Sequence, residues 1–259
     1  MTTNYVCTLL IGSGLGSSIL GVVFALVYLK KKSINTRLKV NVNYASSTAK
    51  VFFKQLKVID DIEIIDLPVL AAKVNNVDHV ITPSLNGEEL CYSPGMEGFS
   101  LFETDFDLLK DVFTDFWSKL GLFRSIISYY TCLHIRRGDK LIYEPSLKVH
   151  SIDMYIEELL TQELVKPILI ITDEYSTFLE FKEKWHKSEV TTTSTPENKG
   201  FNITTINSEP IDTVVKEVDN LLRDLNYIYN SSYFIGTQSS CVSLIGRLIV
   251  DKKKITILQ

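Results

Sequence analysis

The second half of the chain predicts an α/β fold built on a parallel, Rossmann-like sheet. Apolar runs of strand length alternate with segments of helical periodicity across residues 128–259. Polar, turn-forming residues follow these apolar runs where each strand should end. Parallel strands joined by right-handed helical crossovers are the arrangement that fits this alternation. The shorter apolar runs of residues 45–127 predict a smaller α/β subdomain.

The elements of the second half follow one another in order. Strands are predicted at residues 128–133, 167–171, 201–206, 233–235 and 255–258. Helices are predicted at residues 152–164, 175–185, about 210–228 and 241–250, and a polar loop at 191–199. The third helix is the best marked, because one apolar face recurs at helical spacing. That face consists of Ile211, Val214, Val218, Leu221, Leu222, Leu225 and Ile228.

In the first half, one helix is clearly predicted. Its apolar residues recur at helical spacing: Phe106, Leu109, Val112, Phe113, Phe116, Trp117 and Leu120. Glu103 and Asp105 precede this stripe, and acidic residues are favourable at a helix start. An aromatic stripe of this kind is typical of a core-facing helix rather than of an exposed binding surface.

The N-terminal segment predicts a membrane anchor. Residues 6–29 carry no charged side chain and are followed by three lysines, Lys30 to Lys32. A helix of this length can cross a hydrocarbon core of about 30 Å. No basic residue precedes the run, as one would in a cleaved signal peptide. We therefore predict a transmembrane anchor within residues 1–32, followed by a polar stem at 33–44.

The predicted anchor also bears on location. Basic residues follow the span, so the positive-inside rule favours a cytosolic catalytic part. Sequons at Asn202 and Asn230 would be glycosylated only in a lumenal location.

A competing interpretation of the same segment is a strand, a glycine-rich turn and a helix. Gly12 and Gly14 imitate the start of the phosphate-binding fingerprint G-x-G-x-x-G. The sixth position is Ser17 instead of glycine, and no acidic residue follows about 20 positions later. Gly12 and Gly16, four residues apart, are also typical of packed membrane helices. The anchor is the preferred prediction.

Composition excludes other classes of function. The formal net charge is -4, so no excess of basic residues suggests nucleic acid as a partner. The four cysteines are scattered without a C-x-x-C pair, and the four histidines show no helical i,i+4 pairing. We predict neither a disulfide framework nor a metal site.

Three polar segments follow predicted strands, at the edge of a parallel sheet where ligands bind. They are residues 134–140 (HIRRGDK), residues 172–174 (TDE) and residues 236–240 (GTQSS). Guanidinium groups such as those of Arg136 and Arg137 can bind a diphosphate bidentately. The two arginines could equally form a solvated, charged turn.

The third segment and the helix before it add polar groups. Ser239 and Ser240 stand at a helix start, where hydroxyl and backbone N–H groups bind phosphate, or where a serine simply caps the helix. Asp224 lies in the preceding helix, and its carboxylate could accept two N–H bonds from guanine or face solvent. Taken together, the segments predict a site for a nucleoside diphosphate.

The same motifs resemble those of the α-1,6-fucosyltransferases and the bacterial nodulation fucosyltransferases. The shared pattern is H-x-R-R-x-D-K, a glutamate ten residues after the histidine, a T-D-[DE] strand end, and an aspartate sixteen residues before the second serine of T-x-S-S. In this chain the pattern comprises His134, Arg136, Arg137, Asp139, Lys140, Glu144, Thr172, Asp173, Glu174, Asp224, Thr237, Ser239 and Ser240. The segment from His150 to Tyr155 resembles the family's H-P-I-x-x-Y, with Ser151 in place of proline. The region before Tyr129 does not match the family's acceptor-binding half.

The resemblance implies a GT-B-type, metal-independent, inverting transferase that uses GDP-fucose. It assigns guanine binding to His134 and Asp224, the β-phosphate to Arg136, and the diphosphate to Ser240, with Arg137 and Ser239 beside them. The remaining family positions would line the fucose and acceptor side: Asp139, Lys140, Glu144, Tyr155 and Asp173. The catalytic residues would be Arg136, Lys140 and Glu144, with Glu144 as the candidate general base.

We therefore expect a membrane-anchored, Golgi- or ER-type fucosyltransferase acting on a glycan or glycoprotein. Two alternatives remain open. The first is an α-1,2- or protein O-fucosyltransferase, because α-1,2-fucosyltransferases also carry H-x-R-R-G-D. The second is a non-catalytic, membrane-tethered nucleotide-sugar-binding protein.

Overall fold

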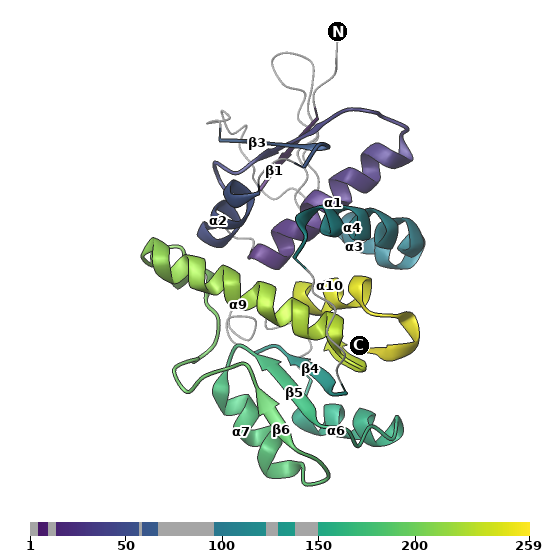
Figure 1. The fold of residues 1–259 in the computed structure, drawn as a ribbon, viewed down its shortest axis with the longest axis vertical. Coiled ribbons are helices and arrows are strands. Elements are labelled where there is room, and N and C mark those ends of the chain that lie inside the picture. Colours follow the sequence, from purple (N-terminus) through teal and green to yellow (C-terminus); the bar gives the residue numbers. More distant parts are fainter. Residues whose placement is uncertain (1–4, 10–13, 57–58, 67–95, 123–128, 138–149) are drawn as a thin grey trace. The chain divides into compact units, whose positions relative to one another are not determined.

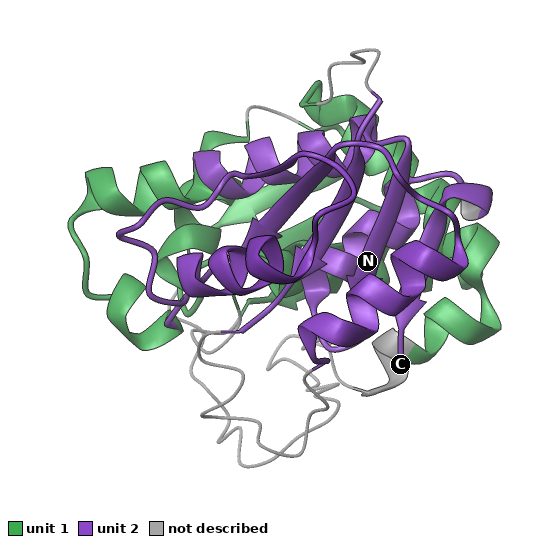
Figure 2. Cartoon of the chain, turned by 90° about the horizontal axis from the view of Figure 1, so that it is seen from below, with its two compact units in different colours: residues 1–122, 203–218 green, residues 123–202, 219–259 purple. Residues whose placement is uncertain are grey.

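The chain folds into two compact α/β units. The computed structural model describes residues 5–9, 14–56, 59–66, 96–122, 129–137 and 150–259 (Figure 1). Unit 1 comprises residues 1–122 and 203–218, and unit 2 comprises residues 123–202 and 219–259 (Figure 2). The last of the three boundaries between them, after residue 218, falls inside helix α9 (Ile211–Asn230).

Unit 2 contains a five-stranded parallel sheet in the order β6-β5-β4-β7-β8. Its strands are β4 (Thr131–Ile135), β5 (Ile168–Thr172), β6 (Val190–Thr192), β7 (Tyr233–Thr237) and β8 (Ile255–Leu258). The chain adds β5 and β6 on one side of β4 and then returns to place β7 and β8 on the other side. A doubly wound sheet has its ligand crevice at this reversal, outside the carboxyl ends of β4 and β7.

Helices cover both faces of this sheet. Helices α6 (Ile152–Thr161) and α7 (Tyr175–Lys184) pack against the face that carries Leu133 and Ile135. Side chains alternate along a strand, so Cys132 and His134 point to the opposite face. Helix α10 (Cys241–Ile249) lies on that opposite face, because its residue Ser243 reaches His134. Figure 1 shows the positions of α6, α7 and α10 around the strands.

The predicted alternation of strands and helices in this half is confirmed, except that one predicted strand is a helix and part of one predicted loop is a strand. Residues 203–206, predicted as a strand, form the short helix α8 (Ile203–Ile206). The missing strand is β6, which lies in the threonine-rich stretch that was predicted to be a loop. Threonine suits a strand because it is β-branched, and the Thr192 hydroxyl donates to the Ile170 carbonyl at 2.8 Å. A three-residue edge strand is too short to show a periodic pattern.

Unit 1 contains a three-stranded parallel sheet in the order β1-β2-β3. Its strands are β1 (Tyr5–Thr8), β2 (Leu38–Asn41) and β3 (Ile62–Ile65). Its helices are α1 (Leu15–Lys31), α2 (Ser47–Gln55), α3 (Met96–Thr104) and α4 (Phe106–Leu120), besides α8 and the start of α9. The predicted helix over 106–120 is confirmed, and its aromatic stripe is buried in the core of the unit.

The prediction of a transmembrane anchor is wrong. Residues 6–29 do not form one helix, because strand β1 comes first and α1 begins only at Leu15. Helix α1 is apolar on nearly all sides since it contacts the sheet, α2 and α4, and a helix buried all round needs no polar face. Within the described residues, no helix combines the length and the hydropathy needed to span a membrane.

The predicted stem is also different in the structure. Residues 33–44 include β2, which is the middle strand of the unit 1 sheet. The strand and helix around residues 10–13 match the secondary structure of the competing fingerprint interpretation, although that turn itself lies outside the described residues. The predicted single-pass membrane location was inferred from the predicted anchor alone.

Candidate nucleotide-binding site

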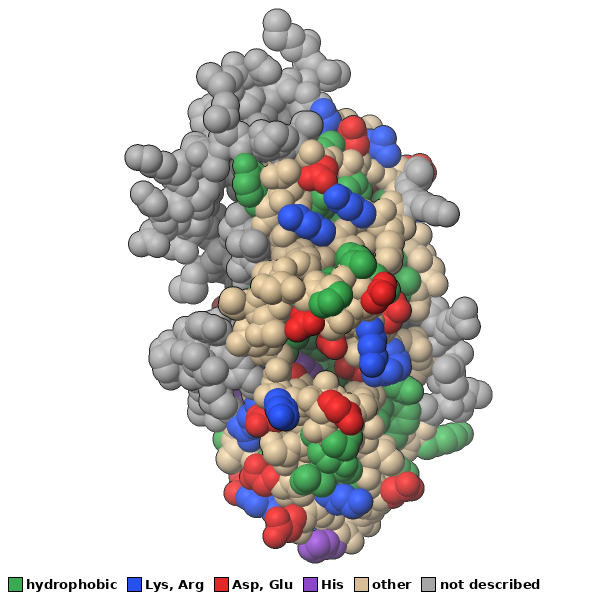
Figure 3. Space-filling view, turned by 90° about the vertical axis from the view of Figure 1, so that its left-hand side faces the viewer, with side chains coloured by type: hydrophobic (Ala, Val, Ile, Leu, Met, Phe, Trp, Pro, Cys, Tyr) green, Lys and Arg blue, Asp and Glu red, His purple; other side chains and the backbone are tan. Residues whose placement is uncertain are grey.

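The candidate site lies at the carboxyl edge of the unit 2 sheet. Arg136 and Arg137 directly follow β4, and Asp173 directly follows β5. Residues 238–240, here termed the β7 turn, connect Thr237 at the end of β7 to α10. In the sheet, β4 lies between β5 and β7, so the three polar segments share one edge, as predicted. On the molecular face shown in Figure 3, basic and acidic side chains are interspersed, and the described residues form no large patch of one charge there.

Asp173 organises the arginine segment. One carboxylate oxygen accepts from Arg136 Nη1 at 2.5 Å and from the Phe201 backbone N–H at 3.1 Å. The other oxygen accepts from the Arg137 backbone N–H at 3.0 Å. The Arg136 and Asp173 side chains are only 16% and 11% exposed, so this ion pair is largely withdrawn from water. Charge-assisted bonds in such surroundings hold a guanidinium in one orientation.

Two further contacts fix the same arginines. The Arg136 guanidinium carbon lies 5.2 Å from the centroid of the Phe201 ring, which is a cation–π contact. Arg137 Nη1 donates to the His150 carbonyl oxygen at 3.1 Å. Sequence reasoning missed Phe201, because it assigned this residue to a strand and nothing in the pattern connects it to Arg136. Backbone pairing places it, since the Gly200 N–H donates to the Asp173 carbonyl at 2.9 Å.

His134 is buried at the end of β4, with 5% of its surface exposed. Its Nδ1 lies 2.7 Å from the Ser243 hydroxyl oxygen, which also accepts from the Thr237 backbone N–H at 3.0 Å. Burial lowers the pKa of His134 to about 4, and the nearby Arg136 charge acts in the same direction. The imidazole is therefore neutral at pH 7 and connects the end of β4 to the β7 turn.

Tyr155 lies in a different position from the one that the resemblance implied. Its side chain is 1% exposed within the core between α6 and the sheet, and its hydroxyl donates to the His134 carbonyl at 3.2 Å. Burial raises the pKa of the phenol, so it remains a donor at neutral pH. Tyr155 therefore stabilises the end of β4 from the core, and it does not line a surface that a sugar could reach.

The β7 turn leads into the N-terminus of α10. Ser240 is the N-cap residue and is buried, but its side chain makes no capping hydrogen bond. The Ser239 hydroxyl lies 3.0 Å from the Thr237 hydroxyl and is partly exposed. A helix N-terminus flanked by hydroxyl groups favours an anion, because its N–H groups and the helix dipole both point toward it.

Asp224 lies on α9, in the part of that helix that belongs to unit 2. The pKa of the Cys132 thiol is raised by burial first and by the Asp224 charge second, so the carboxylate is close to β4. Cys132 and His134 share one face of the sheet, and Asp224 therefore approaches the face on which His134 lies.

Three of the predicted residues cannot be placed. Asp139, Lys140 and Glu144 lie outside the described residues, and their roles stay predictions. In the part of the chain that is described, no group of three or more His, Cys, Asp or Glu side chains could hold a metal ion.

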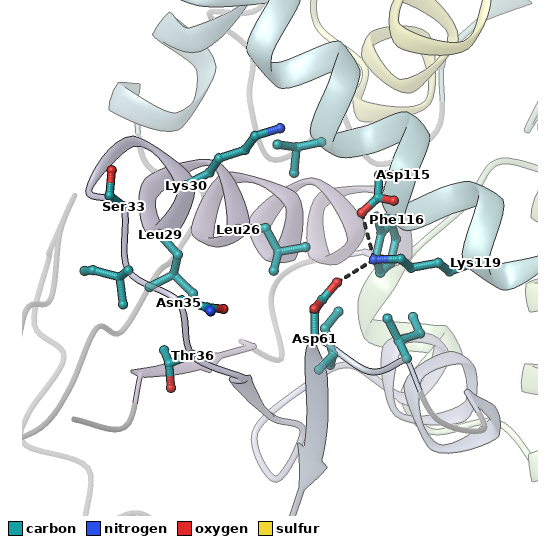
Figure 4. Close-up of a pocket in the computed structure, with 14 residues that line it drawn as sticks. Leu26, Leu29, Lys30, Ser33, Asn35, Thr36, Asp61, Asp115, Phe116 and Lys119 are labelled. Carbon is teal, nitrogen blue, oxygen red and sulfur yellow. Dashed lines mark hydrogen bonds and ion pairs between the residues drawn. The ribbon is translucent and has the colours of Figure 1, made fainter. Parts of the chain in front are cut away.

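A cavity of about 400 Å³ lies elsewhere, in unit 1 (Figure 4). It opens beside the amino ends of β2 and β3, whereas α/β sheets bind ligands at the carboxyl ends. Lys119 lies along it and donates to Asp115 at 2.8 Å and to Asp61 at 2.5 Å. These two carboxylates, Asp115 first, raise the pKa of Lys119. The pattern is that of a structural ion-pair network, and none of the predicted site residues lines this cavity.

Acidification is expected to destabilise unit 2 through His134. An ordinary histidine has a pKa of 6.5, and that of His134 is about 4, so the unfolded chain binds more protons between these values. The free energy of unfolding should thus be highest above pH 6.5 and fall by up to about 3 kcal/mol as the pH drops to 4. Urea unfolding at a series of pH values measures this slope. His134→Gln should flatten it, whereas the exposed His186→Gln should not; equal slopes in all three proteins would contradict the assignment.

The fold and this edge define a class of protein, namely α/β proteins with parallel sheets and polar side chains at the carboxyl ends of neighbouring strands. No protein-family model and no curated protein matches the sequence. Solved structures of a fucosyltransferase share the fold. The chain is similar to NodZ α-1,6-fucosyltransferase soaked with GDP-fucose, with a TM-score of 0.55 and 11% identity over 96% of this chain and 93% of that one.

The likeness recurs in other crystal structures of NodZ. NodZ co-crystallised with GDP gives a TM-score of 0.55, 10% identity and coverage of 96% and 93%. NodZ from Bradyrhizobium gives a TM-score of 0.55, 10% identity and coverage of 96% and 94%. The resemblance predicted from the motifs is thereby confirmed at the level of the fold.

Proposed function

We propose that this protein is a fucosyltransferase that transfers fucose from GDP-fucose to a glycan acceptor, in the manner of an α-1,6-fucosyltransferase. One observation carries the proposal. The fixed Arg136–Arg137 pair and the serine-flanked N-terminus of α10 occupy neighbouring positions at the switch point of the unit 2 sheet. The fold is shared with NodZ, which was crystallised with GDP and soaked with GDP-fucose.

Arg136 stabilises the departing GDP in this proposal. When the bond between the fucose carbon and the β-phosphate oxygen breaks, its electron pair remains on GDP, where negative charge grows. A guanidinium that Asp173 and Phe201 already hold in place can stabilise this charge without reorganising. Arg137 and the α10 N-terminus supply further positive potential. In this proposal, protein groups therefore stabilise the charge that develops on the departing GDP.

The acceptor half follows by a single displacement with inversion. An acceptor hydroxyl forms the new bond to the fucose carbon from the face opposite GDP, and its proton passes to a general base. Glu144, with Lys140 beside it in the sequence motif, is the candidate for this base. Asp173 is assigned a positioning role toward Arg136, because both of its oxygens are engaged there.

The base of the nucleotide is assigned to His134 and Asp224. The neutral imidazole and the carboxylate both approach one face of β4, and together they offer one donor and one acceptor for guanine. We expect GDP to bind more tightly than ADP or UDP.

The test is nucleotide binding followed by transfer. Thermal unfolding of the full chain is measured with GDP, ADP, UDP and GDP-fucose, since a ligand that binds the folded state raises its stability by about 2.7 kcal/mol at 100 times its Kd. At equal concentrations, GDP and GDP-fucose should raise the Tm more than ADP or UDP does. Fucose transfer is then assayed on glycans with α-1,6 and α-1,2 acceptor positions and on protein acceptors.

Each result decides between the alternatives. Failure of GDP and GDP-fucose to bind would refute the proposal outright. Binding of GDP-fucose without hydrolysis or transfer to any acceptor would favour the non-catalytic nucleotide-sugar-binding protein. Transfer only in another linkage, or only to protein, would support the proposed GDP-fucose site but contradict the proposed acceptor.

A further inference from the structure

Ser243 connects two parts of the candidate site from within α10. Its side chain is fully buried, and its hydroxyl oxygen lies 2.7 Å from His134 Nδ1 and 3.0 Å from the Thr237 backbone nitrogen. This approach requires glycine at position 236, because a Cβ there would lie 2.6 Å from the Ser243 hydroxyl oxygen. The sequence motifs did not include Ser243.

The two contacts determine which atom donates. A backbone N–H can only donate, so the Ser243 oxygen accepts from Thr237. The hydroxyl hydrogen of a buried serine needs an acceptor of its own, and among the described residues His134 Nδ1 is the partner within reach. Ser243 therefore donates to Nδ1, which must be unprotonated. A neutral imidazole with a bare Nδ1 carries its proton on Nε2.

We propose that Ser243 is a positioning residue that holds His134 in the tautomer with the proton on Nε2, so that the site presents a hydrogen-bond donor to the nucleobase. Nε2 makes no hydrogen bond to the described residues, and the proposal assigns its N–H to the nucleobase. The consequence for the base rests on the proposed function, in which His134 and Asp224 bind it.

The fixed tautomer predicts which purines are accepted. A donor at Nε2 pairs with the oxygen at position 6 of guanine and meets another donor in the amino group at position 6 of adenine. The Asp224 carboxylate is an acceptor and complements the N–H groups of guanine. Ser243 thus selects 6-oxopurine nucleotides through His134, without touching the nucleotide itself.

The first experiment observes the tautomer directly. Two-dimensional NMR that correlates the ring nitrogens and carbon-bound protons of ¹⁵N-labelled histidine is recorded on the full chain near pH 7. We expect the resonance of His134 Nδ1 to be that of an unprotonated ring nitrogen and the resonance of Nε2 to be that of an N–H. A protonated Nδ1 in the wild-type protein would overturn the proposal, and this measurement needs no variant and no nucleotide.

The second experiment uses Ser243→Ala with a matched control. Removing the hydroxyl frees Nδ1, so the tautomers should mix and the affinity for GDP should fall about 10-fold relative to that for ADP, the scale of one lost hydrogen bond to a buried group. Ser188→Ala removes another bridging hydroxyl of unit 2, which accepts from Trp185 and donates to the Lys166 carbonyl. It should leave both the His134 resonances and the ratio of GDP to ADP affinities unchanged.

The outcomes separate this proposal from the function on which it rests. If Ser243→Ala is folded and leaves the His134 resonances at their wild-type values, Ser243 does not set the tautomer. If the tautomer changes and the GDP preference does not, the role in base selection is rejected. If wild-type protein binds no nucleotide, the proposed function fails, and the ring-nitrogen spectra still decide whether Ser243 controls His134.

Discussion

Replacing Arg136 by alanine is expected to lower the rate of fucose transfer by about 10²–10³-fold, the usual effect of removing one preorganised charge stabiliser. Arg136 is positioned for this role by Asp173 and by the ring of Phe201. Because the stabilised charge develops as the bond to GDP breaks, kcat should fall more than the affinity for GDP. Steady-state kinetics with GDP-fucose, alongside the Kd of GDP, measure the two effects separately.

Two further variants make this result specific. Arg136→Lys keeps the charge but loses the planar fork that meets Asp173, so it should recover only part of the rate. Arg223→Ala removes an exposed arginine of α9 and should transfer fucose at the wild-type rate. Equal rates for Arg136→Ala and the wild type, in folded proteins, would remove Arg136 from the reaction.

Replacing Asp173 by alanine is expected to destabilise unit 2 by about 3–5 kcal/mol, the cost of leaving a buried charge without its partner. The Arg136 guanidinium would lose its counter-ion, and the backbone N–H groups of Arg137 and Phe201 would lose their acceptor. Urea unfolding monitored by circular dichroism gives the free energy. Asp153→Ala is the matched control, since it breaks an ion pair with Lys184 whose aspartate is 71% exposed, worth about 0.2–1 kcal/mol.

The origin of the Asp173 effect can be isolated with a double variant. Combining Asp173→Ala with Arg136→Met removes both charges. The double variant should therefore lose less unfolding free energy than the two single variants lose together. A cost for Asp173→Ala no larger than that of Asp153→Ala would show that Asp173 does not hold the arginine segment.

Local sequence patterns predicted the elements that have strong local signals. The strand near His134, the helix α9 and the glycine-to-serine turn before α10 were all predicted, although β4 continues through His134 to Ile135 and Ile211 of the predicted apolar face is exposed. Parallel strands then bring Arg136, Asp173 and Ser240 to one edge, because each loop follows the carboxyl end of its strand. The motif resemblance added the family whose fold the chain shares.

The misjudged segments are those whose local signal is ambiguous. An apolar helix looks the same in sequence whether lipid or protein surrounds it, and α1 is surrounded by the strands and helices of unit 1. The short edge strand β6 is defined by its pairing with β5 more than by its own composition. Residues 203–206 have strand-like composition and form a helix in their tertiary context.

The sequence by itself determined the sheet of unit 2, its polar edge and the chemical types gathered there. Only the tertiary structure decided the partners of those groups: Phe201 over Arg136, Ser243 on His134, and Tyr155 beneath the strand instead of beside a ligand. The physical reason is that periodicity reports whether a residue faces the core or solvent, which is a property of its own segment. A hydrogen bond between distant segments depends on the paths of two loops and on a missing Cβ at Gly236, and no local pattern encodes these.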